Sequence, residues 1–229
     1  MTGQVENILA KLKQMGNPED AEGMARFGIN TEKAYGIRIP ALRKLGKEIG
    51  RDHELALGLW ETGMHEARIL ASMVDDPEQV TEAQMDAWAG DFNSWDLCDQ
   101  CCGNLFDKTP FAYDKAVEWS GREEEFVKRA GFAMMAWLAV HNKKTEDGLF
   151  EVFLPIIVRE APDERNYVKK AVNWALRQIG KRNLALNGMA IATAEEIDQL
   201  DSKAARWIAK DALRELQGEK VQARLKVQG

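Results

Sequence analysis

Hydrophobic residues recur at spacings of three and four along nearly the whole chain, and no segment alternates convincingly between apolar and polar positions. Spacings of three and four place apolar side chains on one face of a helix, whereas strict alternation is typical of strands. The pattern therefore predicts an all-α protein whose helices are joined by short links and pack as antiparallel neighbours. The expected helices span about residues 3–15, 40–51, 53–62, 65–74, 81–91, 94–106, 110–119, 122–141, 146–160, 163–182, 187–198, 201–216 and 218–226.

Several of these segments carry start signals for a helix. Pro40 follows Ile39, at a position where the first helical turn tolerates proline. Thr81 and Gln84 have the spacing of a capping box, in which each side chain bonds a free backbone amide at the start of the helix. Capping side chains are also expected at Ser94, at Asp163 and at either Asp201 or Ser202.

Tryptophan spacing indicates how the helices are organised. Five of the seven tryptophans are separated by 35, 42, 37 and 33 residues, namely Trp60, Trp95, Trp137, Trp174 and Trp207. This spacing is close to the period of about 40 residues in HEAT-type helical pairs, although any helical bundle can place one large apolar residue in each pair. No long linker divides the chain. We therefore expect one domain over residues 1–229, folded as an α-α superhelix (solenoid) of HEAT-like repeats with a concave surface.

Composition limits the kinds of partner. The chain has 31 Lys and Arg against 37 Asp and Glu, so its formal net charge is −6. That charge excludes a uniformly cationic coat for nucleic acid, so any DNA contact requires positive charge that is gathered locally. No apolar run approaches the ~18–20 residues that span a bilayer. The first sixteen residues are amphipathic and do not resemble a secretory signal. We expect a cytoplasmic protein with no membrane contact.

The segment 163–182 combines a core face with a basic face. On a helical wheel one side carries Val168, Val172, Ala175, Leu176 and Ile179, and the opposite side carries Asn166, Lys170, Trp174, Arg177 and Lys181. Residues 159–182 include seven basic and three acidic side chains. Lysine and arginine neutralise phosphates, and an indole face packs on a sugar or base. The alternative is a solvated helix face whose tryptophan packs on the next helix.

The segment 93–106 carries the candidate chemistry. At helical spacing Trp95, Asp99 and Cys102 share a face, while Cys98 and Cys101 turn elsewhere. A carboxylate beside an aromatic ring can orient water, act as a general base or stabilise a developing cation. The alternative is a surface aspartate beside a half-buried tryptophan.

The three cysteines lack a fourth ligand at the usual spacing for a metal, and they lie within a helix rather than at its start after a strand. We interpret them as buried structural residues and expect neither a metal nor a cofactor.

The segment 125–140 is apolar nearly all round from Phe126 onward, which predicts a central helix. Arg129 lies on a stripe of this helix with small residues. A buried and unpaired charge costs several kcal/mol, so Arg129 requires an anionic partner. Asp99 or a bound phosphate would serve, and so would an internal ion pair without a function.

Together these segments resemble the DNA alkylation repair family of HEAT-like-repeat DNA glycosylases. The resemblance covers roughly residues 20–215. It is strongest in YGIRIPALRKLGKEI (35–49), NSWDLCD (93–99), EFVKRAGFAMMAWLA (125–139) and YVKKAVNWALRQIGKR (167–182). The W-D-x-x-D and V-x-K-A-x-x-W-A-L-R patterns are fairly specific when they occur in this order.

The resemblance implies roles for particular residues. Trp95 and Asp99 match the residues that line the family's catalytic cleft, and Trp174 matches the tryptophan that completes its aromatic wall. Arg129 and Arg177 are expected at the DNA backbone, and Tyr35 at the cleft rim. From the basic stripe we add Lys169, Lys170, Lys181 and Arg182 as DNA contacts, and we expect all these cations to share one concave face.

The activity that the resemblance implies is hydrolysis of the N-glycosidic bond of a cationic alkylated purine. Such a base is already a good leaving group, so a carboxylate such as Asp99 is sufficient to stabilise the oxocarbenium-like sugar and hold the attacking water. Indole faces attract cations by roughly 0.5–2 kcal/mol each. The expected partner is double-stranded DNA with alkylated bases, bound by a monomer. The alternative is a non-catalytic HEAT-like module that binds structured nucleic acid or a protein.

Overall fold

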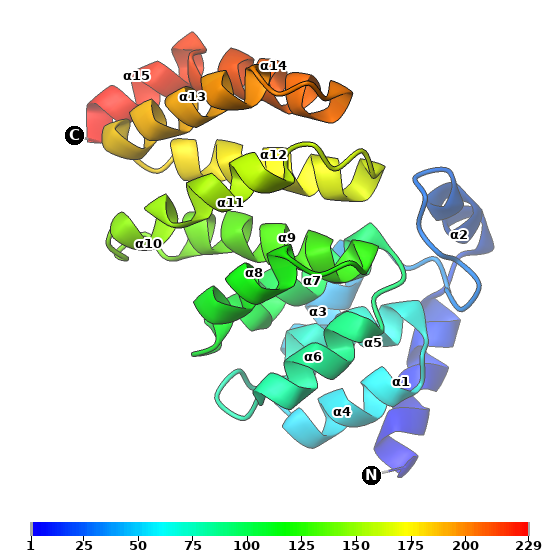
Figure 1. The fold of residues 1–229 in the computed structure, drawn as a ribbon. Coiled ribbons are helices and arrows are strands. Elements are labelled where there is room, and N and C mark those ends of the chain that lie inside the picture. Colours follow the sequence, from blue (N-terminus) through cyan, green and yellow to red (C-terminus); the bar gives the residue numbers. More distant parts are fainter. Residues whose placement is uncertain (1, 229) are drawn as a thin grey trace. The chain divides into compact units, whose positions relative to one another are not determined.

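The computed structural model describes residues 2–228, and within this range all the regular secondary structure is helical, without a β-strand (Figure 1). No helix in that range is both long and apolar enough to cross a membrane. The elements are α1 (Thr2–Met15), α2 (Pro18–Ala25), α3 (Ile39–Ile49), α4 (His53–Glu61), α5 (His65–Val74), α6 (Glu82–Gly90), α7 (Trp95–Asn104), the 3-10 helix η1 (Phe106–Lys108), α8 (Ala112–Ser120), α9 (Glu125–His141), α10 (Gly148–Glu151), α11 (Phe153–Glu160), α12 (Asn166–Gly180), α13 (Leu184–Asp198), α14 (Lys203–Leu216) and α15 (Glu219–Gln228).

The predicted helices are all present, with two differences. The helix α2 was not predicted, and the segment expected to be one helix at 146–160 is interrupted at Val152, so that it forms α10 and α11. The all-α prediction is confirmed.

The predicted helix starts are confirmed in part. The Ser202 side chain caps α14 by accepting from the Ala205 amide. Thr81 Oγ1 accepts from the Gln84 amide, but the Gln84 side chain donates to Asp75 rather than turning back to Thr81. The prediction for Asp163 is wrong.

The N-cap residue of α12 is Arg165, and the Asp163 carboxylate accepts from the Arg165 amide at 3.0 Å. Ser94 stands at the N-cap of α7 as predicted, but its side chain makes no capping bond and donates to Asp96.

The chain divides into two compact units, of which the first ends at Thr109 and the second begins at Pro110. In the first unit α5 is central, and α3, α4 and α7 pack on it. Its interior is aromatic, because the Trp60 and Trp88 rings stack at 3.9 Å. The expectation of one repeat domain over the whole chain stays a prediction.

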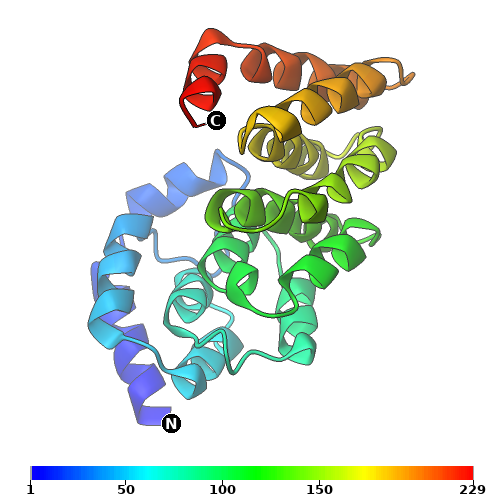
Figure 2. The same ribbon diagram turned by 90° about the vertical axis from the view of Figure 1, so that its left-hand side faces the viewer.

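The second unit is a series of packed helical pairs. The helix α9 packs on α8 and α12, and α12 packs in turn on α13 and α14. Figures 1 and 2 show the same order of layers from α9 through α12 to α14. The tryptophan spacing follows this pairing, since Trp137 lies on α9, Trp174 on α12 and Trp207 on α14.

The helix α9 is central to its unit, as predicted, because every residue from Val127 to Ala136 is buried. Gly131 is where α9 meets α8. A Cβ at this position would lie 2.4 Å from the Ser120 amide nitrogen and 2.9 Å from the Ala116 carbonyl oxygen. Only glycine permits so close an approach of the two backbones.

Candidate functional site

The helix α7 carries the candidate pair of the first unit. Trp95 is its first residue and Asp99 follows one turn later, and both are partly exposed. Asp96 anchors the start of the helix. Its Oδ2 lies 2.8 Å from His65 Nε2, and its Oδ1 accepts from Ser94 Oγ at 2.8 Å. Burial raises the pKa of Asp96, but the bonds from His65 and Ser94 outweigh it and hold the pKa below its ordinary value. This carboxylate is therefore structural, and Asp99 is the second carboxylate of the helix.

Trp95 is fixed by a bond that the sequence did not predict. Its indole Nε1 donates to the Phe27 carbonyl oxygen at 3.0 Å. Phe27 lies in the turn after α2, and its side chain is 72% exposed. Phe27 therefore exposes its aromatic ring to solvent while its backbone carbonyl holds the Trp95 indole by a hydrogen bond. No pattern in the sequence distinguishes Phe27, because it lies outside any apolar periodicity.

Tyr35 owes its position to a buried carboxylate. Glu66 is fully buried on α5 and accepts from three consecutive backbone amides, those of Tyr35 (2.8 Å), Gly36 (2.6 Å) and Ile37 (3.1 Å). Gly36 has a φ of +78°, and a Cβ here would lie 2.1 Å from the Asn17 carbonyl oxygen. Gly36 is therefore required by a turn that wraps around Glu66.

The three cysteines form no disulfide and are fully buried, which confirms that they are buried as predicted. Cys102 lies on the face of Trp95 and Asp99 by helical spacing, but it lies beneath the surface. Burial raises the pKa of the Cys101 and Cys102 thiols well above their ordinary value. Among residues 2–228, no three side chains of the metal-binding types gather into a possible site.

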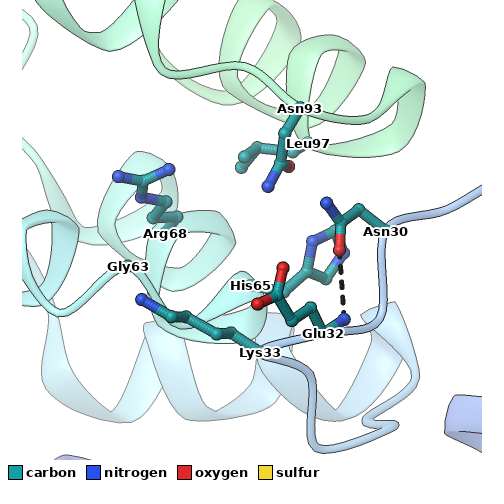
Figure 3. A pocket seen from close by; sticks show the side chains of 8 residues that line it. All are labelled: Asn30, Glu32, Lys33, Gly63, His65, Arg68, Asn93 and Leu97. Carbon is teal, nitrogen blue, oxygen red and sulfur yellow. Dashed lines mark hydrogen bonds between the residues drawn. The ribbon is translucent and has the colours of Figure 1, made fainter.

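A polar pocket of about 240 Å³ lies in the first unit, and Figure 3 shows the side chains around it. It is lined by Asn30, Glu32, Lys33, Gly63, His65, Arg68, Asn93 and Leu97. The Arg68 guanidinium is already engaged, since it pairs with Asp91 at 2.9 Å and covers the Trp60 ring at 5.1 Å. Leu97 of α7 lines this pocket, but neither Trp95 nor Asp99 does.

In the second unit the helical wheel of α12 is confirmed. The five side chains predicted for the core are all fully buried, namely Val168, Val172, Ala175, Leu176 and Ile179. On the other side Asn166 and Lys170 are exposed, and Trp174, Arg177 and Lys181 are partly exposed.

Trp174 is one of a pair of aromatic residues. Its ring meets the Trp137 ring of α9 edge to face, with centroids 5.4 Å apart and an interplanar angle of 82°. Trp137 also stacks on His141 at 4.9 Å. Edge-to-face contacts are a preferred geometry for aromatic pairs, so Trp137 fixes the orientation of the Trp174 ring. The tryptophan spacing marks Trp137 as part of the repeat, but no pattern in the sequence predicts it as a site residue.

Arg129 is buried in α9 and donates through Nη1 to the Tyr167 carbonyl oxygen of α12 at 2.7 Å. Tyr167 in turn packs its ring on Phe126 with centroids 5.5 Å apart. The arginine thus joins the first turn of α12 to α9. Whether an anion also meets its guanidinium stays a prediction.

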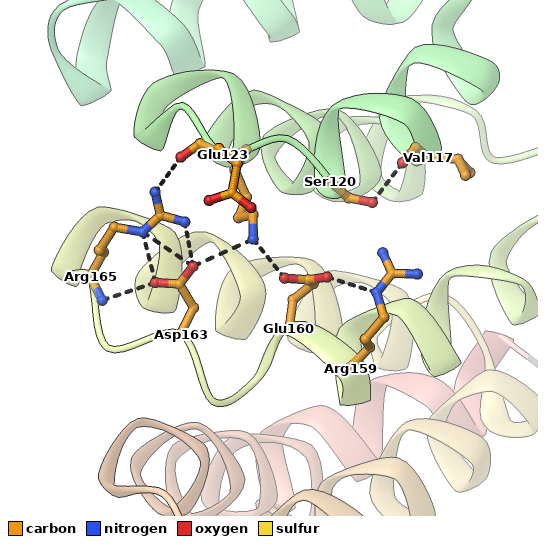
Figure 4. Close-up of polar contacts among 8 residues, drawn as sticks. Val117, Ser120, Glu123, Arg159, Glu160, Asp163 and Arg165 are labelled. Carbon is orange, nitrogen blue, oxygen red and sulfur yellow. Dashed lines mark hydrogen bonds and ion pairs between the residues drawn. The ribbon is translucent and has the colours of Figure 1, made fainter.

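A group of charged residues holds the link between α11 and α12 against α9 (Figure 4). Lys128 Nζ lies 2.7 Å from Glu160 and 3.6 Å from Asp163, and Arg165 pairs with Asp163 at 2.5 Å and donates to the Glu123 carbonyl. Burial raises the pKa of Glu160, but the bonds from Lys128 and Arg159 lower it further and leave it below its ordinary value. The network fixes how α12 lies along α9, and so how Trp174 meets Trp137.

The basic side chains predicted to contact DNA differ in whether they already have partners within the protein. Arg177 and Lys181 share the carboxylate of Glu215 on α14, at 2.5 and 2.7 Å. Arg182 donates to the carbonyls of Ala139 and Thr145, at 2.9 and 3.1 Å.

The two lysines in the first half of α12 lie elsewhere. Lys170 is exposed, and Lys169 Nζ lies 5.3 Å from the centroid of the Trp207 ring on α14. The basic residues of α12 therefore do not form one uniform stripe. That the site residues of the two units meet one DNA stays a prediction.

Comparisons with known proteins bear on the fold and the family of this chain. A solved structure aligns with 93% of this chain and 95% of its own, with a TM-score of 0.77 at 20% sequence identity. It is described as "a new family of proteins related to the HEAT-like repeat DNA glycosylases with affinity for branched DNA structures". The predicted HEAT-like helical fold is thereby confirmed. No curated protein sequence matches the chain. The model of the DNA alkylation repair enzyme family matches residues 8–216, and the chain therefore belongs to that family.

Proposed function

We propose that this protein is a DNA glycosylase that hydrolyses the N-glycosidic bond of cationic N3- or N7-alkylated purines in double-stranded DNA. The observation that carries the proposal is the pair on α7, where Trp95 and Asp99 are partly exposed one turn apart in a member of a DNA alkylation repair family. Asp96, three residues earlier, bonds His65 and Ser94 at the start of the helix, and the proposal assigns the reaction to Asp99, which matches the second aspartate of the W-D-x-x-D pattern.

The chemistry requires little more than this carboxylate. An alkylated purine that carries a positive charge leaves without protonation, so the barrier lies in the oxocarbenium character of the deoxyribose. A fixed carboxylate stabilises that charge and holds the attacking water. The indole faces of Trp95 and Trp174 pack on the sugar and the charged base, with an attraction of roughly 0.5–2 kcal/mol each. No metal or cofactor takes part, so EDTA is expected to leave the rate unchanged.

DNA contacts outside the reaction centre complete the proposal. Arg129 and Arg177 bind the backbone, assisted by Lys169, Lys170, Lys181 and Arg182, and Tyr35 lies at the rim. Because Glu215 already neutralises Arg177 and Lys181, we expect these two to contribute less to affinity than Lys170, which is exposed.

The test is release of 3-methyladenine and 7-methylguanine from methylated duplex DNA, measured in single turnovers at saturating enzyme. Loss of one preorganised electrostatic partner costs about 2.7–4 kcal/mol, so Asp99→Asn is expected to be about 10² to 10³ times slower than wild type. The matched control is Asp114→Asn, which removes an exposed carboxylate on α8. Equal rates for wild type and Asp99→Asn would disprove the role of Asp99.

A second function is favoured by one observation, the affinity for branched DNA that is described for the solved structure. In that case the protein binds structured DNA without cleaving it. Wild-type protein that releases no base, yet binds a three-way junction more tightly than a duplex of equal length, would support the binding function over the glycosylase.

A further inference from the structure

The cations in the second half of α12 are already engaged within their own unit. The Glu215 carboxylate pairs with both Arg177 and Lys181. A second carboxylate, that of Asp211, also lies near Arg177, with Oδ2 3.7 Å from Nε. Arg182 turns inward, with its guanidinium over the Phe150 ring at 3.9 Å. Each of these three side chains therefore already has an ion-pair or hydrogen-bond partner within its own unit.

Exposed positive charge with an aromatic residue among it lies on α14 and the adjoining first half of α12. The buried face of α14 consists of Ala204, Ala205, Ile208, Ala209, Ala212 and Leu216. Its exposed face carries Lys203, Arg206, Trp207, Lys210 and Arg214. Arg206 and Arg214 pair with Asp201 and Asp211. Lys203 and Lys210 have no ion pair among the described residues, and α14 lies beside α12 in both ribbon views (Figures 1 and 2).

Trp207 is the aromatic residue in this basic surface. Its side chain is 41% exposed, and Lys169 of α12 reaches its ring with Nζ 5.3 Å from the centroid. A hydrophobic side chain of this size gains about 1.5–3 kcal/mol when it is fully buried, so leaving the indole in water between lysines carries a cost. Exposed aromatic rings that alternate with cations are the arrangement by which proteins bind single-stranded nucleic acid.

The surface around Trp207 is held rigid. Glu164, in the link before α12, accepts from Ser202 Oγ and from the Ala204 amide, both at 3.1 Å. Ser202 also caps the first turn of α14 through the Ala205 amide. These bonds tie the start of α14 to the start of α12, which is where Lys169 meets Trp207. A ligand therefore meets a surface that is already ordered, and the entropic cost of binding is small.

We propose that Lys169, Lys203, Trp207 and Lys210, here called the α14 platform, bind an unpaired stretch of DNA, with one base stacked on the Trp207 ring. Lys203 and Lys210 lie on either side of the indole and about 10 Å apart along the helix axis, so each can meet a phosphate flanking the stacked base. The base must be unpaired, because in a duplex both of its faces are covered by its neighbours. The inference rests on the proposed function only in that the protein acts on DNA.

The experiment measures the fluorescence anisotropy of a labelled thymidine oligonucleotide and of a duplex of the same length, each titrated with the full-length protein. Base–aromatic stacking contributes about 1–3 kcal/mol, so Trp207→Ala is expected to weaken single-strand binding about 5-fold to 150-fold and to weaken duplex binding far less. Trp207→Phe should restore most of the loss. The control is Met189→Ala, which shortens an equally exposed apolar side chain on α13.

A salt titration adds a second readout. Each phosphate contact on a single strand contributes about −0.7 to the slope of log K against log salt, so Lys203→Gln with Lys210→Gln should reduce the slope by about 1.4. Unchanged single-strand affinity in Trp207→Ala, or equal losses on single strand and duplex, would overturn the platform. Base release is not used in either measurement, so the platform can hold if the glycosylase proposal fails, and the reverse.

Discussion

The turn that presents Tyr35 depends on one carboxylate, and its removal has a calculable cost. Glu66 is fully buried and accepts from the amides of Tyr35, Gly36 and Ile37. A buried amide left without a partner costs about 1–3 kcal/mol. Glu66→Ala leaves three of them, so we expect the free energy of unfolding to fall by about 3–9 kcal/mol, toward the lower end if water enters the space.

The milder variant Glu66→Gln keeps one carbonyl oxygen for the same amides and loses the charge. Hydrogen bonds to charged groups contribute about 1.5–3 kcal/mol and neutral ones about 0.5–1.5 kcal/mol, so three bonds lose about 3 kcal/mol in total. The control is Glu48→Gln, since Glu48 is half-exposed and its pair with Lys11 is screened by solvent. Exposed pairs of this kind contribute about 0–1 kcal/mol.

Two assays check this prediction. The first is urea unfolding followed by tryptophan fluorescence. The free energy of unfolding is expected to fall most in Glu66→Ala, less in Glu66→Gln and least in the control Glu48→Gln. Hydrogen exchange resolved to residues 35–37 should show the amides protected in wild type and exchanging much faster in Glu66→Ala. If these amides exchange equally fast in both proteins, or if Glu66→Ala costs less than about 1 kcal/mol, the carboxylate does not hold the turn.

Two further predictions concern buried charge and buried thiols. The Glu160 pKa is lowered by Lys128, so the stability from this pair is present above the ordinary glutamate pKa of 4.5 and is lost as the pH falls through the lowered value. We expect Lys128→Met to cost about 3–5 kcal/mol at pH 7 and to flatten the dependence of unfolding free energy on pH between 5 and 3; parallel profiles for wild type and variant would contradict this. Cys98, Cys101 and Cys102 are fully buried, and burial raises the pKa of the last two, so no thiol should react with Ellman's reagent in the native protein at pH 8 and all three should react in urea. Rapid labelling of native protein would show that the thiols open to solvent.

The helices could be predicted because each long helix buries one face, and that face leaves a periodic pattern. The exception illustrates the rule. The helix α2 buries none of its side chains, so it has no apolar stripe, and only Asn17 and Pro18 mark its start. For the same reason Trp174 could be placed opposite the core of α12 from the helical wheel alone.

What the sequence did not predict depends on contacts between distant segments. Glu215 lies 38 residues after Arg177, and nothing local to α12 indicates that a carboxylate from α14 neutralises its basic face. Trp137 and Trp174 meet because α9 and α12 pack at a particular crossing. Phe27 is connected to the site only through its carbonyl oxygen, which accepts from Trp95 of a distant segment. The residue types of the site could therefore be read from the sequence, whereas their partners could not.

The backbone contact at Gly131 has a consequence for the direction of Arg129. A helix that touches its neighbour through a glycine cannot turn about its own axis without forcing the two backbones together. Arg129 precedes Gly131 by two residues and so lies about 200° away around α9, on the side that faces away from α8. There it meets the Tyr167 carbonyl of α12. Gly131 thus fixes the rotation of α9 about its own axis, and with it the direction of the Arg129 side chain. A methyl group added at position 131 would rotate the helix and so redirect Arg129, although the two residues do not touch.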